Sequence, residues 1–179
     1  MLITEALAEL KTLVKRIEKK REYVRAYLYR PDGLKDPLEK DGGSQEVLKK
    51  ELQAIMDLNK RVIDLRTSIQ KTNLSTPLTV EGATMSIAEW LTWRKEVSDG
   101  DVRFISQARQ TLLQARTQAQ QRGASVLAPG ATAQNPSDVI VNVDEGDLAK
   151  QAEKLETILG VLDGQLSLKN ATIQVEGIA

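Results

Sequence analysis

The stretch "LKKELQAIMDLNKRVIDLRTSI", Leu48 to Ile69, decides the fold of this chain. Four aliphatic residues recur in it at seven-residue intervals, and we call them the heptad row: Leu48, Ile55, Val62 and Ile69. A seven-residue repeat is typical of a helix that packs lengthwise against another helix. Because apolar residues flank the row on both sides, we expect one partner helix to cover the narrow row but not both of its flanks. The stretch therefore predicts a long helix with apolar surface to spare.

The segment before this stretch supplies the first partner helix. Apolar residues recur every three or four positions from Ile3 to Tyr29, the pattern of an amphipathic helix. The motif "RPDG" at Arg30–Gly33 ends it, and the following proline and glycine residues exclude a regular element. Residues 1–76 are therefore predicted to form an antiparallel helical hairpin.

The segment after it, "NLSTPLTVEGATMSIAEW" from Asn73 to Trp90, interrupts the helical pattern. Pro77 ends the second helix, since the residue before a proline avoids the helical conformation. Two β-prone runs on either side of Glu81-Gly82 predict a β-hairpin over residues 77–86. The spacing Ser86-x-x-Glu89 is a capping box and predicts a third helix over residues 87–123.

The rest of the chain predicts a loop or arm over residues 124–138, and then a strand, a fourth helix and a terminal strand over residues 139–179. We expect the β-prone segments to meet in one small sheet: Leu78–Val80, Met85, Val139–Val143 and Thr172–Val175. The predicted fold is a single domain of residues 1–179. It is mainly α, with about four helices in long antiparallel hairpins and a small β cap.

The amino-acid composition excludes several kinds of catalytic and metal-binding chemistry. The chain has no cysteine and no histidine, which removes thiolate chemistry and the commonest general base and metal ligand. Asp144 and Asp147 stand where acidic residues favour a helix start, and Asp99 and Asp101 lack the further ligands of a calcium loop. We therefore predict no catalytic, cofactor-binding or metal-binding residue, and a protein that is not an enzyme.

Net charge and hydropathy argue against nucleic acid and membranes as partners. Lysine and arginine total 25, as do aspartate and glutamate, so no global charge attracts nucleic acid or a membrane. No apolar run approaches the roughly 20 residues that span a bilayer. The amino-terminal residues do not resemble a signal peptide, so we expect cytoplasmic synthesis.

Several segments resemble the septicolysin-like family of small, mainly helical bacterial and phage proteins. These are "TEALAEL" (Thr4–Leu10), "IQKTNLSTPL" (Ile69–Leu78), the Ser-x-x-Glu helix start and the final helix that runs to Asn170. The chain departs from that family at Ala171, where an Asn-Trp pair is usual, and at "WRKEVSDGD" in the third helix. The resemblance implies a helical fold, and no chemistry, since the family has no assigned function.

These observations favour a structural or assembly protein that self-associates or joins a larger particle through its hairpins. A virion component, such as a phage capsid or tail accessory protein, is one form of this hypothesis. A nucleic-acid adaptor that uses the basic face of the first helix is a further alternative. Candidate interface residues are the tyrosines and the heptad row: Tyr23, Tyr27, Tyr29, Leu48, Ile55, Val62 and Ile69. Trp90, Trp93 and Phe104, of which Trp90 and Phe104 share a heptad phase with Val97, are interpreted as a plug between the β cap and the helices.

Overall fold

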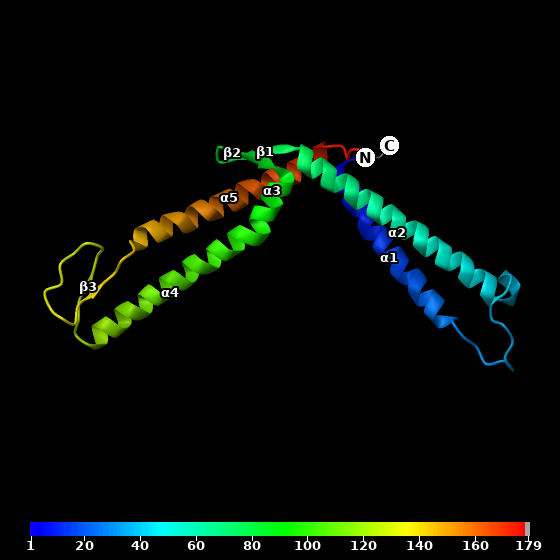
Figure 1. Ribbon diagram of the computed structural model, residues 1–179, viewed down its shortest axis with the longest axis horizontal. Helices are drawn as coiled ribbons and strands as arrows, with labels where there is room; N and C mark the ends of the chain where they lie inside the picture. Colours follow the sequence, from blue (N-terminus) through cyan, green and yellow to red (C-terminus); the bar gives the residue numbers. More distant parts are fainter. Residues whose placement is uncertain (178–179) are drawn as a thin grey trace. The chain divides into compact units, whose positions relative to one another are not determined.

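The computed structural model describes residues 1–177, and the chain is mainly helical, as predicted (Figure 1). In order, the elements are α1 (Ile3–Ala26), η1 (Glu39–Asp41), α2 (Ser44–Ser75), β1 (Pro77–Val80), β2 (Ala83–Ser86), α3 (Ile87–Thr92), η2 (Trp93–Ser98), α4 (Asp99–Gln121), β3 (Val126–Leu127), β4 (Val139–Ile140) and α5 (Glu145–Thr172). Since α3, η2 and α4 follow one another without a break, the long helical segments number four among the described residues.

The fold gathers into two compact units. The terminal unit holds Met1–Thr76 and the chain from Ser167 onward, and the central unit holds Pro77–Leu166. The chain passes between them at the end of α2 and within α5. The single domain over residues 1–179 stays a prediction, and each unit is described by itself.

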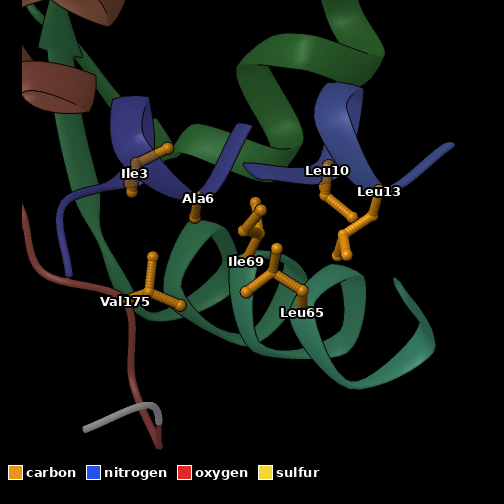
Figure 2. Close-up of a cluster of buried hydrophobic side chains, with 7 residues drawn as sticks. All are labelled: Ile3, Ala6, Leu10, Leu13, Leu65, Ile69 and Val175. Atoms are coloured by element: carbon orange, nitrogen blue, oxygen red, sulfur yellow. The ribbon is translucent and has the colours of Figure 1, made fainter. Parts of the chain in front are cut away.

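The core of the terminal unit is the seam between α1 and α2 (Figure 2). The buried cluster contains seven aliphatic side chains: Ile3, Ala6, Leu10, Leu13, Leu65, Ile69 and Val175. A second cluster continues the seam with Ile17, Val24 and Ile55. The α1 members recur at three- and four-residue spacing, so they line one face of that helix. This seam is the helical hairpin that the sequence predicts.

The carboxyl-terminal segment completes this unit by pairing with the amino terminus. The Ile3 N–H donates to the Ile173 carbonyl at 3.0 Å, and the Val175 N–H donates to the Met1 carbonyl at 2.9 Å. The Glu176 N–H donates to Oγ1 of Thr72, a buried side chain of α2, at 2.9 Å. Gln174, in the terminal β-prone run, therefore forms an isolated antiparallel β-bridge with Leu2.

The prediction of one common sheet is wrong. The β1 strand pairs only with β2, in antiparallel register, whereas β3 pairs with β4 in parallel. The terminal run pairs with the start of the chain instead. The physical reason is that each β-prone run satisfies its backbone hydrogen bonds with a separate partner, which is the adjacent strand for β1 and the start of the chain for the terminal run. The β3 strand lies in the segment predicted to be a loop or arm, residues 124–138.

The central unit begins with the predicted hairpin. Glu81 and Gly82 both have positive φ, 47° and 81°, as the two central residues of a type I′ turn require. The Ser86 hydroxyl accepts from the Glu89 N–H at 3.2 Å, and the Ser86 N–H donates to the Glu89 carboxylate at 2.7 Å. This reciprocal pair is the predicted capping box. The hydrogen bonds that the Glu89 carboxylate accepts from the Ser86 N–H and the Ser86 hydroxyl lower its pKa.

The third helical segment contains a π-helical stretch, η2, between Trp93 and Ser98. Gly100 lies inside α4, so it does not break the helix. A π-helical turn holds about one residue more than an α-helical turn, which rotates the following residues by about 100°. Accordingly, the buried row runs from Trp90 to Ser98 and then to Ile105, with a spacing of eight and then seven.

The connection between α4 and α5 is held by a carboxylate. The α4 helix ends at Gln121, and Gly123 follows with φ of 67°. The Asp138 carboxylate then accepts N–H groups from Ser125, Gln134 and Asn135 at 3.0 to 3.2 Å, which lowers its pKa. These bonds fold the segment 124–138 back onto itself beside the β3–β4 pair.

No helix of residues 1–177 combines the length and the apolar composition that a bilayer crossing requires.

Candidate interaction surfaces

The heptad row of α2 is not an exposed interface, which corrects the prediction. Ile55 and Ile69 are buried in the two clusters against α1, and Leu48 and Val62 pack against the same clusters. The reason is that α1 covers this row along its length, since it is the nearest apolar surface in the chain. The row therefore holds the hairpin together, and of its members Leu48, which is half-buried, also lines an open groove.

A different row of α2 is left uncovered, and we call it the α2 row. Leu52, Met56, Ile63 and Leu74 are each between 51% and 65% exposed. Their spacings of four, seven and eleven residues keep them within one narrow face of a helix with 3.6 residues per turn. Leu52, Met56 and Ile63 lie within about three turns of helix, and Leu74 lies about 16 Å further along the same face. This is the apolar surface left over when α1 covers the heptad row.

Basic side chains flank the α2 row. Lys49, Lys60, Arg66 and Lys71 are all exposed and lie within about one quarter turn of it on the helix surface. At the amino-terminal end of α2, the row joins an open groove of about 960 Å³ that Leu28, Leu48, Leu52 and Met56 help to line. The row is therefore an apolar strip with positively charged edges.

The three candidate tyrosines lie near this groove, in different environments. Tyr29 is 88% exposed and lines the groove together with Tyr27. Tyr23 stacks against Tyr27, with ring centroids 4.9 Å apart and planes at 52°. Partial desolvation, with smaller contributions from Tyr27, Asp41 and Glu51, raises the pKa of Tyr23. The structure thus places Tyr27 and Tyr29 at one end of the α2 row.

The basic charges of α1 are partly neutralised by acidic neighbours. Lys20 forms an ion pair with Glu51 of α2 at 2.6 Å, and Arg21 lies 3.7 Å from Glu18. Arg61 of α2 pairs with Glu9 of α1 at 3.0 Å in the same way. The first helix therefore presents mixed charge, and nothing in this geometry favours nucleic acid over protein.

Asp36 supplies the cap of α2, which sequence reasoning missed. Its carboxylate accepts the Ser44 N–H at 2.8 Å and the Leu38 N–H at 2.9 Å, and it also accepts the Ser44 hydroxyl. These hydrogen bonds, chiefly those from Ser44, lower the Asp36 pKa to about 2. The signal in the sequence was an aspartate eight residues before the first helical residue, a separation that no local capping rule covers.

The three residues interpreted as a plug separate in the structure. Trp90 is 3% exposed, and its indole N–H donates to the Leu78 carbonyl of β1 at 2.9 Å. Trp93 is half-buried and meets Trp90 edge to face, with ring centroids 5.5 Å apart. Phe104 is 63% exposed, so its assignment to the plug is wrong. The extra residue in η2 rotates it outward and brings Ile105 inward instead.

Phe104 borders a groove between α4 and α5, which we call the Phe104 groove. The α4 and α5 helices are spaced more widely than α1 and α2. The wider spacing leaves a groove of about 390 Å³. One bank carries Trp93, Asp101, Phe104 and Ile105, and the other carries Gln151, Lys154, Leu155 and Ile158.

Within residues 1–177, no group of three or more acidic side chains lies close enough together to hold a metal ion.

No family model matches this chain, and no curated protein sequence matches it. The fold is similar to a crystal structure described as a functionally unknown conserved protein from Corynebacterium diphtheriae. The TM-score is 0.57, the match covers 98% of this chain and 99% of that chain, and 19% of residues are identical. At this identity the likeness shows a shared fold alone. The resemblance to the septicolysin-like family stays a prediction.

Proposed function

We propose that this protein is a non-enzymatic assembly protein that associates with copies of itself through its helical hairpins. The observation that supports this most directly is the α2 row, Leu52, Met56, Ile63 and Leu74, exposed along one helix face. Burial of apolar surface contributes roughly 25 cal/mol per Å², so four such side chains offer a substantial driving force to a partner.

The basic edges of the row define the kind of surface that fits it. A helix with apolar residues on one stripe and carboxylates beside them is complementary to the row and its lysine and arginine neighbours. The carboxyl-terminal part of this chain has that charge, because residues 138–179 hold eight acids against Lys150, Lys154 and Lys169. A second copy therefore carries suitable chemistry.

The proposal is tested by removing the apolar row without adding charge. We expect the double variant Met56→Gln, Ile63→Gln to weaken self-association at least about tenfold, since a few buried apolar anchors carry most of an interface's energy. The matched control is Asp57→Gln, Asp64→Gln, which changes the two adjacent residues on another face of α2. Sedimentation velocity over a range of concentrations measures both.

Two outcomes contradict the proposal. Wild-type protein that stays a monomer at every concentration would overturn self-association. Equal weakening by the test and control variants would show that the α2 row has no special part in it.

A further inference from the structure

A second surface, on the central unit, is shaped to pair with itself. In a layer of two helices, each helix has one side against its neighbour and leaves both faces of the layer open. Along α4 and α5 the Phe104 groove opens on one of these faces, between banks lined by Phe104 and Ile105 on α4 and by Leu155 and Ile158 on α5. These side chains are apolar, and Phe104 is largely exposed beside the opening.

The charges at the groove are opposite on its two banks. Asp101 lines the α4 bank, and Lys154 lines the α5 bank. Further along the helices the order of charge is reversed, because α4 from Val102 to Gln121 carries three arginines and no acid. In contrast, α5 from Glu145 to Leu166 carries five acids and two lysines. A partner that fits both banks must carry the reverse order of charge across its own width.

A second copy of this chain satisfies that requirement. A twofold axis that runs parallel to the helices, midway between two facing layers, places α4 of one copy over α5 of the other. Asp101 of each copy then faces Lys154 of the other, and each Phe104 lies over the bank formed by Leu155 and Ile158. Every neighbouring pair of helices is antiparallel in this arrangement, which is the common form of a four-helix bundle.

We propose that the Phe104 groove is closed by the same groove of a second copy, in an isologous four-helix bundle of two α4–α5 pairs. This inference rests on the proposed self-association and adds a second interface, distinct from the α2 row. Phe104 is its aromatic anchor, because aromatic side chains in the centre of an interface contribute most of the binding energy.

The test uses the full chain and two charge reversals, Asp101→Lys and Lys154→Glu. Each variant alone places like charges at both symmetric contacts, so we expect its dimer dissociation constant to rise at least about tenfold. An equimolar mixture of the two variants restores one reversed pair and one natural pair across the interface. We therefore expect the mixture to form a heterodimer close to wild-type strength, measured by sedimentation velocity or native mass spectrometry.

The mixture also separates this contact from effects within one chain. In each variant the two banks of its own groove carry like charge. If repulsion within one chain weakened the dimer, that repulsion would remain in the mixture, and the heterodimer would be as weak as the single variants. Phe104→Asp provides a second variant, expected to weaken the dimer as strongly. Its control is Gln110→Asp, at an exposed position about 120° around α4 from Phe104. Phe104 is 63% exposed, so the substitution leaves the fold intact, which far-UV circular dichroism checks.

The outcomes distinguish the two proposals. A dimer that ignores Phe104→Asp and both charge reversals overturns the four-helix bundle and leaves the α2 row standing. A mixture that fails to recover also overturns it. A dimer that responds to Phe104→Asp and not to the α2 variants overturns the α2 row alone. A monomeric wild-type protein overturns both.

Discussion

Two neighbouring residues, Phe104 and Ile105, exchange the roles that a regular heptad assigns them. In an uninterrupted α-helix, Trp90, Val97 and Phe104 share one face. The π-helical stretch from Trp93 to Ser98 inserts an extra residue, and the buried face passes to Ser98 and Ile105. The sequence does not signal this change, because Phe104 and Ile105 are both apolar and either one could be the buried residue. An aromatic side chain therefore faces outward where the pattern predicts a core residue.

Trp90 is the residue whose role follows most directly from the sequence. Replacement by alanine removes a buried ring and its hydrogen bond to Leu78, so we expect Trp90→Ala to destabilise the protein by roughly 3–5 kcal/mol, as other large-to-small core changes do. Urea unfolding followed by circular dichroism measures the change. Leu91→Ala, at an exposed neighbouring position, serves as the control. A loss below about 1 kcal/mol for Trp90→Ala would contradict the core role.

At the scale of elements, the helices and the β-hairpin could be predicted because their signals are local. The heptad row, the Pro77 stop, the Glu81-Gly82 turn and the Ser86–Glu89 box each act within a few residues of sequence. The β3 strand was missed because two residues, Val126 and Leu127, in a proline- and glycine-containing segment carry no periodicity. Its partner strand and the Asp138 carboxylate, both distant in sequence, hold it in place.

The exposed row of α2 was missed for a different reason. The helix carries apolar residues on two faces, and the sequence does not state which face its partner covers. That choice depends on how α1 meets α2 along the whole seam, from Ile3 against Ile69 to Val24 near Ile55. The prediction that one partner helix leaves apolar surface of α2 uncovered is confirmed. The residues predicted for that surface, the heptad row, instead pack against α1.

The cap of α2 makes a testable contribution to pH dependence. The Asp36 pKa is lowered from 3.8 to about 2 in the folded protein by the hydrogen bonds from Ser44 and Leu38. A carboxyl group with a depressed folded pKa stabilises the fold above its unfolded pKa, and this contribution disappears as pH falls through the folded value. We expect Asp36→Ala to melt at a lower temperature than wild type near neutral pH, and the difference to shrink between about pH 4 and pH 2.

Differential scanning calorimetry at several pH values measures this difference. Asp32→Ala, at an exposed position of the same connection, is the control. A difference in melting temperature that stays constant down to pH 2 would show that Asp36 acts through something other than its ionised carboxylate.

At the scale of the whole molecule, the two proposed surfaces belong to different compact units. An isologous contact stops at a dimer when a chain has one such surface, whereas two distinct surfaces let association continue to larger closed or open assemblies. We expect wild type to exceed the dimer at high concentration. Phe104→Asp should associate through the α2 row alone, and the α2 double variant should stop at a dimer through the Phe104 groove.

Combining Met56→Gln, Ile63→Gln and Phe104→Asp should leave a monomer, because substitutions at independent sites act additively. Sedimentation velocity of the combined variant measures this outcome. Persistence of a dimer in the combined variant would reveal a third contact that neither surface explains.

The added residue in η2 also bears on how relatives of this chain are to be compared. In a gap-free alignment, a relative without the insertion would have its inward residue opposite Phe104, whereas the inward residue here is Ile105. A correct alignment therefore needs a single gap between Trp93 and Ser98. Gain or loss of one codon there turns an aromatic side chain from the inside of a helix to its outside. Lineages can thus acquire or lose an outward-facing phenylalanine by length change alone, with no substitution at that position.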